Sequence, residues 1–326
     1  MPGPEAAELD RARAGDVRAL ARLLTLVEDG SPQLRSVMKE LLPRTGAAWV
    51  IGLTGAPGVG KSTTAGALVA AFRAAGRRVA VLAVDPTSPF TGGALLGDRV
   101  RMQEHATDDQ VFIRSMASRG HPGGLAAAAP QAIRVLDAAG FELILVETVG
   151  VGQAEVAVAS LADSVVVLLA PGMGDAIQAA KAGILEVADL FVVNKADKPD
   201  SHQVVRDLRT MIALGHTEPG GWKPPIITAV ATGGLRDAGI VELESCLEAH
   251  WSWLGSSGEL KRRRRLRARE EIITLAFATL RAHLRADGID ELAARVAAGT
   301  LDPFLAAEEL LARRVPDLPL RRGKAA

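Results

Sequence analysis

Seven short aliphatic runs, bounded by glycine, proline or aspartate, constrain the fold of this chain more than any other feature of its sequence. The runs are AWVIGLTG, RRVAVLAVD, VFIRSM, FELILVET, SVVVLLAP, LFVVNKAD and PPIITAVA. Strands that are apolar along their whole length and alternate with helix-length segments are typical of a parallel sheet covered on both faces. We therefore predict a doubly wound α/β fold with a mostly parallel sheet.

Helical patterns flank this core on both sides. Leucines lie three and four positions apart in DVRALARLLTLVED and SPQLRSVMKELL, and Ser31 followed by Pro32 is a helix start signal. After about residue 255 a helical pattern returns and continues through DPFLAAEELLARR. The sequence thus predicts a helical N-terminal extension over residues 1–46, an α/β domain over 47–255 and a helical C-terminal region over 256–326.

Composition excludes several classes of protein. The 326 residues include 38 basic and 38 acidic side chains, so the overall charge gives no reason to expect nucleic acid or an anionic membrane as partner. The single cysteine, Cys246, excludes an intrachain disulfide and a CxxC metal site. The N-terminus lacks the pattern of a secretory or transit peptide, and no apolar run approaches the roughly 18 residues that a membrane span needs. We expect a soluble, cytoplasmic protein.

The segment GAPGVGKS, Gly55 to Ser62, has the GxxxxGK[ST] pattern and lies between the first aliphatic run and an alanine-rich helical segment. Its glycines let backbone N–H groups surround a phosphate, and the N-terminal end of the following helix favours an anion. Lys61 is expected to reach the β- and γ-phosphate oxygens, and the Ser62 hydroxyl is expected to ligate Mg²⁺. The segment therefore predicts a nucleotide site of the P-loop type.

The tetrad NKAD places Asn194, Lys195 and Asp197 directly after the run LFVV. A carboxylate in the plane of the base accepts the N1–H and 2-amino groups of guanine, and adenine has neither, so Asp197 is expected to select guanine. Lys195 should lie along the base, and Asn194 should tie its loop to the phosphate loop. The tetrad is weak evidence alone, but it lies where α/β sheets bind ligands, at the carboxyl end of a strand. We predict GTP or GDP as ligand, with the backbone near Ala229 contacting the guanine oxygen.

The segment expected to face the γ-phosphate departs from the usual DxxG pattern of GTPases. In ETVGVGQAE, Glu147 stands where aspartate is expected and Gly150 where glycine is expected. Glutamate is longer by one methylene group, so it could hold Mg²⁺ through a water molecule. Asp85, in VDPTSP, and Asp98, in GALLGDRVRM, are further candidates for the magnesium and the γ-phosphate, although an Asp-Pro turn also simply ends a strand.

Several polar residues leave alternatives open. Gln153 follows Glu147 by six positions, later than the water-orienting glutamine of Ras-like proteins, so this role is not assigned to it. Lys181 and Arg119 lie in glycine-rich segments and fit either a cation that offsets phosphate charge or a solvated surface charge. His121 fits loop packing as well as it fits a functional role.

The run KRRRRLRAR, from Lys261 to Arg269, has no interleaved aromatic residue and is followed at once by two glutamates. It therefore favours a solvated or intersubunit helix face over a nucleic-acid site. Trp222, Trp251 and Trp253 are expected to anchor the last sheet elements to the C-terminal helices rather than to form a binding platform.

Several long segments together resemble one family. GAPGVGKST, AVDPTSPFTGGALLGDRVRM, RSMASRGHPGGLA, ETVGVGQAEVAV, PGMGDAIQAAKAGILEVAD and NKAD are similar to the motifs of the MeaB/ArgK P-loop G proteins, bacterial relatives of the methylmalonic aciduria type A protein. The resemblance implies a GTP hydrolase of the metallochaperone and signal-recognition class that is homodimeric through its C-terminal helices. It also implies a chaperone for an adenosylcobalamin-dependent acyl-CoA mutase, chiefly methylmalonyl-CoA mutase, which gates cofactor loading and protects the mutase from inactivation.

The resemblance also implies roles for single residues. It assigns the phosphates to Gly55, Ala56, Pro57, Gly58, Val59, Gly60, Lys61, Ser62 and Thr63, and the base to Asn194, Lys195 and Asp197. It assigns magnesium and switch roles to Asp85, Asp98 and Glu147. With the P-loop pattern, this gives Ser62, Asp85 and Glu147 as candidate magnesium residues and Lys61, Asp98, Glu147 and Lys181 as candidate catalytic residues. Lys181 matches a lysine of an extra switch loop that couples the nucleotide state to the mutase.

Two other functions share this kind of core. A kinase that phosphorylates a periplasmic amino-acid-binding protein would use a P-loop, but the guanine tetrad argues against an ATP-dependent enzyme. A nickel-insertion GTPase usually carries His- or Cys-rich metal sites, whereas this chain has one cysteine and 6 scattered histidines. A mutase chaperone without a nucleic-acid or membrane partner is the favoured hypothesis.

Overall fold

The structure is a computed structural model that describes residues 4–85, 105, 107–117, 125–148, 158, 160–172, 187–214, 220–285 and 288–315. Its internal contacts divide the chain into two compact units, Met1–Arg269 and Glu270–Ala326.

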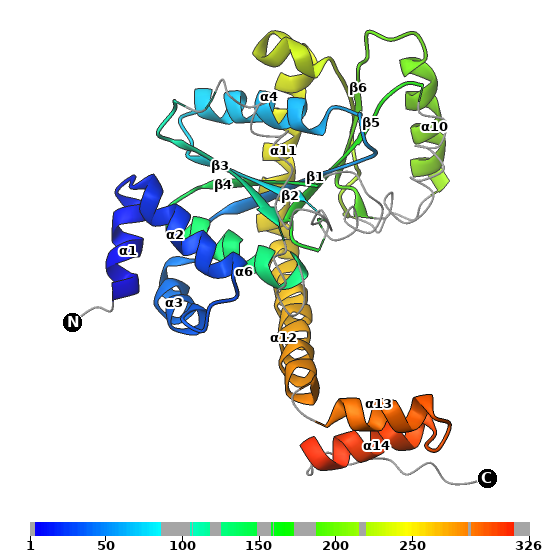
Figure 1. Ribbon diagram of the computed structural model, residues 1–326. Helices are drawn as coiled ribbons and strands as arrows, with labels where there is room; N and C mark the ends of the chain where they lie inside the picture. Colours follow the sequence, from blue (N-terminus) through cyan, green and yellow to red (C-terminus); the bar gives the residue numbers. More distant parts are fainter. Residues whose placement is uncertain are drawn as a thin grey trace. The chain divides into compact units, whose positions relative to one another are not determined.

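Seven parallel strands form the sheet at the centre of the first unit (Figure 1). They are β1 (Trp49–Thr54), β2 (Val79–Asp85), β3 (Val111–Ala117), β4 (Leu143–Thr148), β5 (Ser164–Leu169), β6 (Leu190–Asn194) and β7 (Ile226–Ala229). Their order is β3-β2-β4-β1-β5-β6-β7, and every neighbouring pair is parallel. Each strand coincides with one of the seven aliphatic runs, so the predicted doubly wound α/β fold is confirmed.

Helices precede, cover and follow this sheet in the described part of the chain. They are α1 (Pro4–Arg13), α2 (Val17–Glu28), α3 (Leu34–Leu41), α4 (Lys61–Ala74), α6 (Leu125–Ala138), α10 (Ser201–Leu214), α11 (Ala238–Ser257), α12 (Glu259–Arg285), α13 (Ile289–Ala297) and α14 (Pro303–Arg314), with short 3-10 turns at Leu42–Arg44 (η1) and Ala231–Arg236 (η4). Several begin at a capping aspartate. The Asp16 side chain, for example, accepts hydrogen bonds from the backbone N–H groups of Arg18 and Ala19 and so starts α2.

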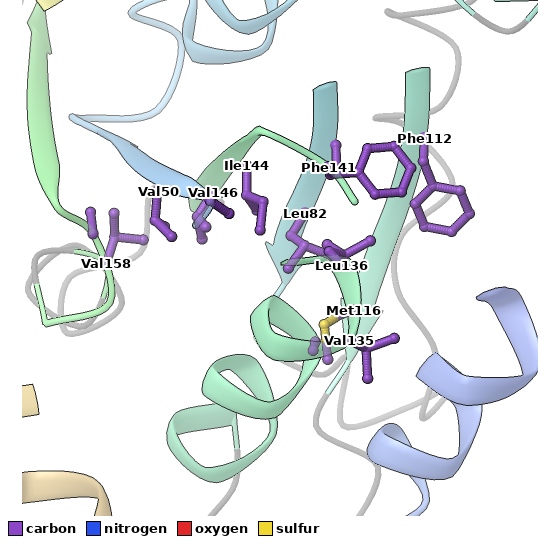
Figure 2. Close-up of a cluster of buried hydrophobic side chains, with 14 of the residues drawn as sticks. Val50, Leu82, Phe112, Met116, Val135, Leu136, Phe141, Ile144, Val146 and Val158 are labelled. Carbon is purple, nitrogen blue, oxygen red and sulfur yellow. The ribbon is translucent and has the colours of Figure 1, made fainter. Parts of the chain in front are cut away.

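Two buried clusters, one on each face, explain why the strands are apolar throughout. Successive residues of a strand point to opposite faces of a sheet. On one face, Ile51 of β1 belongs to a cluster with Phe72 of α4 and Leu243 of α11. On the other face, Val50 of β1 belongs to a cluster with Leu136 of α6 (Figure 2). Side chains of α1–α3 and α10 belong to the same cluster. Both faces of the sheet are therefore shielded from water.

The N-terminal helices are held to the edge strand β3 by a partly buried ion pair. The guanidinium of Arg114 donates from Nη2 to Oε2 of Glu28 at 2.7 Å and from Nε to Oε1 at 3.0 Å. Glu28 is 5% exposed, so the carboxylate of α2 is satisfied from within the protein. The predicted N-terminal helices thus pack on the α/β core as part of the first unit.

The second unit contains the end of α12 together with α13 and α14. Leu292 of α13 and Ala306 of α14 are buried within it, and Arg313 of α14 pairs with Glu291 of α13. Large apolar side chains of the same unit remain exposed, among them Phe277 and Phe304. In the described residues, none of the helices is both long enough and apolar enough to cross a membrane.

Candidate functional site

The predicted site residues that the structure describes lie where parallel strands end. Leu53 of β1 lies beside Glu147 of β4, and Asn194 of β6 lies beside Ala229 of β7. Strand β1 lies between β4 and β5. Strands β2 to β4 lie on one side of β1, and β5 to β7 lie on its other side. Such a switch point, at the carboxyl ends of the strands, is where α/β sheets bind ligands. The sheet therefore brings the predicted phosphate loop, Glu147 and the base tetrad to one edge.

The phosphate loop connects β1 to α4 and needs its glycines for conformation and space. Gly55, Gly58 and Gly60 have φ angles of 140°, 77° and 99°, in the region that favours glycine. A Cβ atom on Gly55 would lie 2.3 Å from the carbonyl oxygen of Leu168, and one on Gly60 would lie 2.3 Å from Nδ2 of Asn194. The loop backbone thus runs in direct contact with the ends of β5 and β6.

Lys61 folds back over the loop that it follows. Its Nζ donates to the carbonyl oxygens of Gly55 at 2.6 Å and Ala56 at 3.0 Å, and the residue is 7% exposed. Phosphate oxygens carry more negative charge than these carbonyl oxygens, so they would compete for the same ammonium group. Lys61 therefore lies over the loop that is predicted to bind phosphates, and its contact with the β- and γ-phosphates stays a prediction.

Ser62 and Glu147 are joined at the start of α4. The Ser62 hydroxyl donates to Oε1 of Glu147 at 2.6 Å, and the two residues are 5% and 3% exposed. The glutamate that replaces the usual aspartate thus reaches the serine predicted to ligate magnesium. Two buried oxygen donors at the mouth of a phosphate loop fit a hard cation such as Mg²⁺, which prefers oxygen ligands.

The remaining magnesium and switch candidates are only partly described. Asp85 is the last residue of β2, beside Ala117 of β3, and its side chain lies outside the described residues. Asp98, Gly150 and Lys181 lie outside the described residues. The same holds for the other open candidates, Arg119, His121 and Gln153.

The tetrad after β6 is bound to the phosphate loop by two side chains. Asn194 donates from Nδ2 to the carbonyl oxygen of Val59 at 2.8 Å. Lys195 has a φ of 55° and donates from Nζ to the carbonyl oxygen of Gly58 at 2.7 Å. Asp197 is exposed in the turn that follows, where its carboxylate is open to a base. The expected link from Asn194 to the phosphate loop is therefore present.

The loop after β7 is tied to the same tetrad. The backbone N–H of Ala231 donates to Oδ1 of Asn194 at 3.0 Å, and the N–H of Ala196 donates to the carbonyl oxygen of Ala229 at 3.1 Å. Asp237, which the sequence motifs did not point to, belongs to the same loop: its Oδ1 accepts from the N–H groups of Val230 at 3.1 Å and Ile240 at 3.2 Å. An aspartate just before a helical segment is a capping signal, and it could have been found as one.

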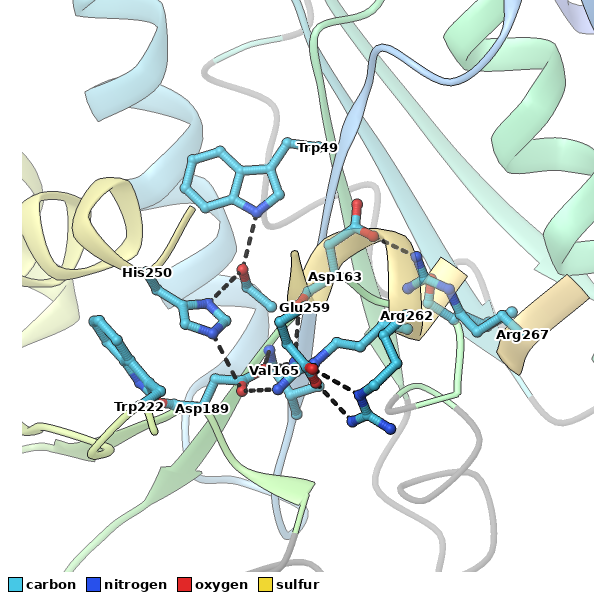
Figure 3. Close-up of polar contacts among 12 residues, drawn as sticks. Trp49, Asp163, Val165, Asp189, Trp222, His250, Glu259, Arg262 and Arg267 are labelled. Atoms are coloured by element: carbon cyan, nitrogen blue, oxygen red, sulfur yellow. Dashed lines mark hydrogen bonds and ion pairs between the residues drawn. The ribbon is translucent and has the colours of Figure 1, made fainter. Parts of the chain in front are cut away.

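The basic run lies at the amino-terminal ends of the strands, at the end of the sheet opposite the phosphate loop. It forms the first turns of α12, and there Arg263 pairs with Asp189 while Arg264 and Arg267 pair with Asp163 (Figure 3). The expectation of a solvated or intersubunit helix face is wrong for these three arginines. Arg267 follows Arg264 by three positions and Arg263 by four, so helical spacing brings the three side chains near one another, but it does not show what they face.

The two aspartates are ionised inside the protein. Burial opposes the charge of Asp163, but hydrogen bonds and charge from Arg264 and Arg267 hold its pKa below the usual range. Burial likewise opposes ionisation of Asp189, while His250 and Arg263 hold its pKa low. These carboxylates carry their charge at neutral pH because the arginines compensate for the loss of water.

The tryptophans support the same end of the sheet. Trp251 stacks on Trp49 at the start of β1, with 5.1 Å between the ring centroids. Trp222 donates from Nε1 to the carbonyl oxygen of Asp189 at 2.7 Å and lies against His250. Trp253 stacks on His250, with 5.7 Å between centroids, and also lies against Trp222. Trp222 thus contacts both the segment before β6 and α11, in line with the expectation for the last sheet elements, whereas Trp251 packs on the first strand, β1.

These features define a P-loop nucleotide-binding protein. A glycine-bracketed loop with its lysine and serine follows a strand, and the parallel sheet has its switch point at that loop. The Asn-Lys-x-Asp tetrad bound to this loop places it in the guanine-nucleotide class. Residues 20–288 match the family model described as methylmalonyl Co-A mutase-associated GTPase MeaB. The chain belongs to this family and is a P-loop GTPase.

Similarities to individual known proteins support the same family. A protein of Pyrococcus abyssi that carries the name of a GTPase is 46% identical over 309 residues, which cover 93% of this chain and 94% of that one. The mitochondrial methylmalonic aciduria type A homolog of Caenorhabditis elegans is 34% identical over 269 residues, or 77% of this chain and 67% of that one. A crystal structure described as LAO/AO transport system kinase superposes with a TM-score of 0.70 at 26% identity and covers 95% of this chain and 98% of its own.

Proposed function

We propose that this GTPase is a chaperone of an adenosylcobalamin-dependent acyl-CoA mutase, chiefly methylmalonyl-CoA mutase, and that its nucleotide state gates cofactor loading and protects the mutase from inactivation. The observation that carries the proposal is the family match over residues 20–288, because the family is described by its association with that mutase. The likeness to a methylmalonic aciduria type A homolog supports the same partner.

In the proposed reaction the protein positions GTP and offsets charge rather than forming a covalent bond. Lys61 exchanges the carbonyl oxygens of Gly55 and Ala56 for β- and γ-phosphate oxygens, where its charge stabilises the transition state. Asp197 receives the N1–H and 2-amino groups of guanine. Asp98 and Lys181, which lie outside the described residues, keep the switch roles implied by the resemblance.

Magnesium belongs to the same proposal. The buried oxygens of Ser62 and Glu147, 2.6 Å apart, fit a site in which Ser62 binds the ion directly and Glu147 acts through a water molecule. Asp85 is the third proposed ligand. When bound, Mg²⁺ would neutralise charge on the phosphate oxygens.

The test is GTP hydrolysis by the purified full chain, alone and with methylmalonyl-CoA mutase. We expect slow hydrolysis that the mutase accelerates, and no hydrolysis by Lys61→Ala under either condition. If methylmalonyl-, ethylmalonyl- and isobutyryl-CoA mutases all neither bind the chain nor accelerate hydrolysis, the chaperone function is wrong. Transfer of a labelled γ-phosphate to a protein substrate would instead identify a kinase.

The proposal also includes a homodimer formed through the C-terminal region, residues 256–326. Ile272, Phe277 and Phe304 are 67%, 65% and 82% exposed within the second unit, and large exposed apolar side chains are expected where a helix meets another protein surface. Light scattering should give twice the mass of one chain for the wild type and a single mass for Phe277→Asp. Val17→Asp, at an exposed position of α2, is the control that should remain dimeric. A monomeric wild type would contradict the dimer.

A further inference from the structure

The arginines of α12 do more than cover the amino-terminal ends of the strands, because the carboxylates they hold are part of the strands' backbone pairing. Arg263 grips Asp189 with two bonds, Nη1–Oδ2 at 2.8 Å and Nη2–Oδ1 at 2.9 Å. Arg264 grips Asp163 in the same way, Nη2–Oδ2 at 2.8 Å and Nε–Oδ1 at 3.1 Å, and Arg267 adds a further bond to Asp163. Paired bonds of this kind fix orientation as well as distance.

Each aspartate stands directly before a strand and is bound to the neighbouring strand. Oδ2 of Asp163 accepts from the N–H of Val50 at 3.1 Å, and the Asp163 N–H donates to the Val50 carbonyl at 2.7 Å. Oδ2 of Asp189 accepts from the N–H of Val165 at 2.8 Å, and the Asp189 N–H donates to the Val165 carbonyl at 2.9 Å. The two carboxylates therefore fix where β5 starts relative to β1, and where β6 starts relative to β5.

A series of linked, buried side chains connects the start of β5 to the start of β6. His250 of α11 lies with Nε2 3.3 Å from Oδ1 of Asp189 and with Nδ1 2.8 Å from the Ser164 hydroxyl, which also accepts from Nε1 of Trp49 at 2.9 Å (Figure 3). Ser164 and His250 are fully buried. This arrangement has no access for a substrate, so it holds the strand starts together rather than acting as a nucleophile.

The opposite ends of the same two strands touch the two ends of the phosphate loop. The carbonyl oxygen of Leu168, in β5, leaves no room for a side chain on Gly55, at the start of the loop. Asn194, at the end of β6, bonds to Val59 and leaves no room for a side chain on Gly60, at the end of the loop. A β-strand is extended and has little slack, so a shift of its start along the strand direction moves its other end with it.

We propose that Asp163 and Asp189, gripped by the arginines of α12, are positioning residues for the phosphate loop: they set how far β5 and β6 extend and thereby hold Gly55 and Gly60 in the geometry that retains guanine nucleotide. Loss of the arginine–aspartate hydrogen bonds then speeds nucleotide release. It does not change which base is selected, because Asp197 is not altered. This inference rests on the proposed function in one respect only, namely that the protein binds GDP.

The test is the release rate of a fluorescent GDP, carrying a methylanthraniloyl group, from the full chain after addition of excess GDP. We expect Arg263→Gln to release it about fivefold faster than the wild type, the size typical of a mutation that modulates coupling between distant sites. Arg263→Lys keeps the charge but loses the paired bonds, so it should fall between the two. Preference for GDP over ADP should not change in either variant.

Arg262→Gln is the matched control. Arg262 lies on the same helix and pairs with Glu259, as Arg263 does, but its side chain is 59% exposed and, within the described residues, its ion pair is with that glutamate alone. It should release GDP within about twofold of the wild-type rate. Equal acceleration in Arg262→Gln and Arg263→Gln would overturn the inference, because the loss of any helix arginine would then suffice.

A purely structural role predicts a different result. Arg263→Gln would then have a lower thermal unfolding midpoint while its GDP release stays within about twofold of the wild type, and this outcome overturns the inference. If Arg263→Gln does not fold, Arg267→Gln decides by the same criterion, since it leaves Arg264 on Asp163. A wild type that binds no GDP would overturn guanine-nucleotide binding and this inference together, whereas normal binding with unchanged release in the variants would overturn this inference alone.

Discussion

The Ser62 hydroxyl donates a 2.6 Å hydrogen bond to Oε1 of Glu147, which joins the start of α4 to the end of β4 inside the protein. The two residues are 85 positions apart, and only the parallel pairing of β1 with β4 brings them together. The extra methylene group of glutamate is used in this contact. Glu147 therefore orients the serine that we propose as a magnesium ligand.

Shortening or neutralising Glu147 should raise the magnesium requirement of GTP hydrolysis. Glu147→Ala removes the acceptor of Ser62, and a change in the groups that orient a metal ligand typically costs about 10–100-fold in metal affinity or activity. The measurement is the hydrolysis rate over a series of Mg²⁺ concentrations. Glu142→Ala, an exposed carboxylate just before β4, serves as control. An unchanged magnesium dependence in Glu147→Ala would remove this residue from the proposed metal site.

Asp197→Asn should exchange guanine for xanthine as the preferred base. The amide can donate to the 2-oxo group of xanthine, whereas the carboxylate accepts from the 2-amino group of guanine, so GTP affinity should fall by roughly 100-fold while XTP affinity rises. Binding of the two nucleotides by calorimetry checks this. The same substitution at Asp200, an exposed aspartate of the same turn, should leave GTP binding as it is. Retained preference for GTP in Asp197→Asn would show that another group reads the base.

The strands and the site at their carboxyl ends could be predicted from the sequence, because both depend on residues that are close together in the chain. A buried parallel strand is a continuous apolar run, and the phosphate loop and the tetrad are short segments whose function depends on adjacent residues. The tie from Asn194 to the phosphate loop was predictable because both segments end at the same edge of the sheet. Each of these inferences uses positions that are close in sequence or fixed by strand direction.

The opposite end of the sheet could not be predicted in the same way. Arg263 and Asp189 are 74 positions apart, and the sequence pattern of α12 does not show which side of the helix meets the sheet. The related segments LADSVVV and VADLFVV each place an aspartate before a strand, and this repetition was the available signal. A charged residue at the start of a buried strand needs a partner, but its identity depends on how distant helices pack.

Asp237 should stabilise the loop that follows β7 and should support nucleotide binding through it. Asp237→Ala removes the acceptor of Val230 and the cap of α11, at a cost of about 1–2 kcal/mol in the free energy of unfolding. GDP affinity should fall as well, because this loop is bonded to Asn194. Asp237→Asn keeps an acceptor oxygen and should restore both properties. Chemical denaturation and GDP titration measure them.

Asp302→Ala is the control for helix capping alone. Asp302 caps α14 in the second unit by accepting from the N–H groups of Phe304 and Leu305. Its removal should leave GDP affinity at the wild-type value. If Asp237→Ala also keeps wild-type GDP affinity, Asp237 is a helix cap and the loop does not depend on it for binding.

Acid should weaken the first unit through Asp163 and Asp189. The pKa of each is held below the ordinary value of 3.8 in the folded protein, so the unfolded chain binds more protons as the pH falls. The stabilisation is therefore complete above about pH 5 and is lost progressively as the pH drops below 4 through the folded pKa. Asp163→Asn should lower the free energy of unfolding at pH 7 by about 3 kcal/mol, because Arg264 and Arg267 lose their charged partner. It should also flatten the acid dependence in denaturant titrations between pH 7 and pH 3, and an equally steep dependence in this variant would assign the acid sensitivity to other carboxylates.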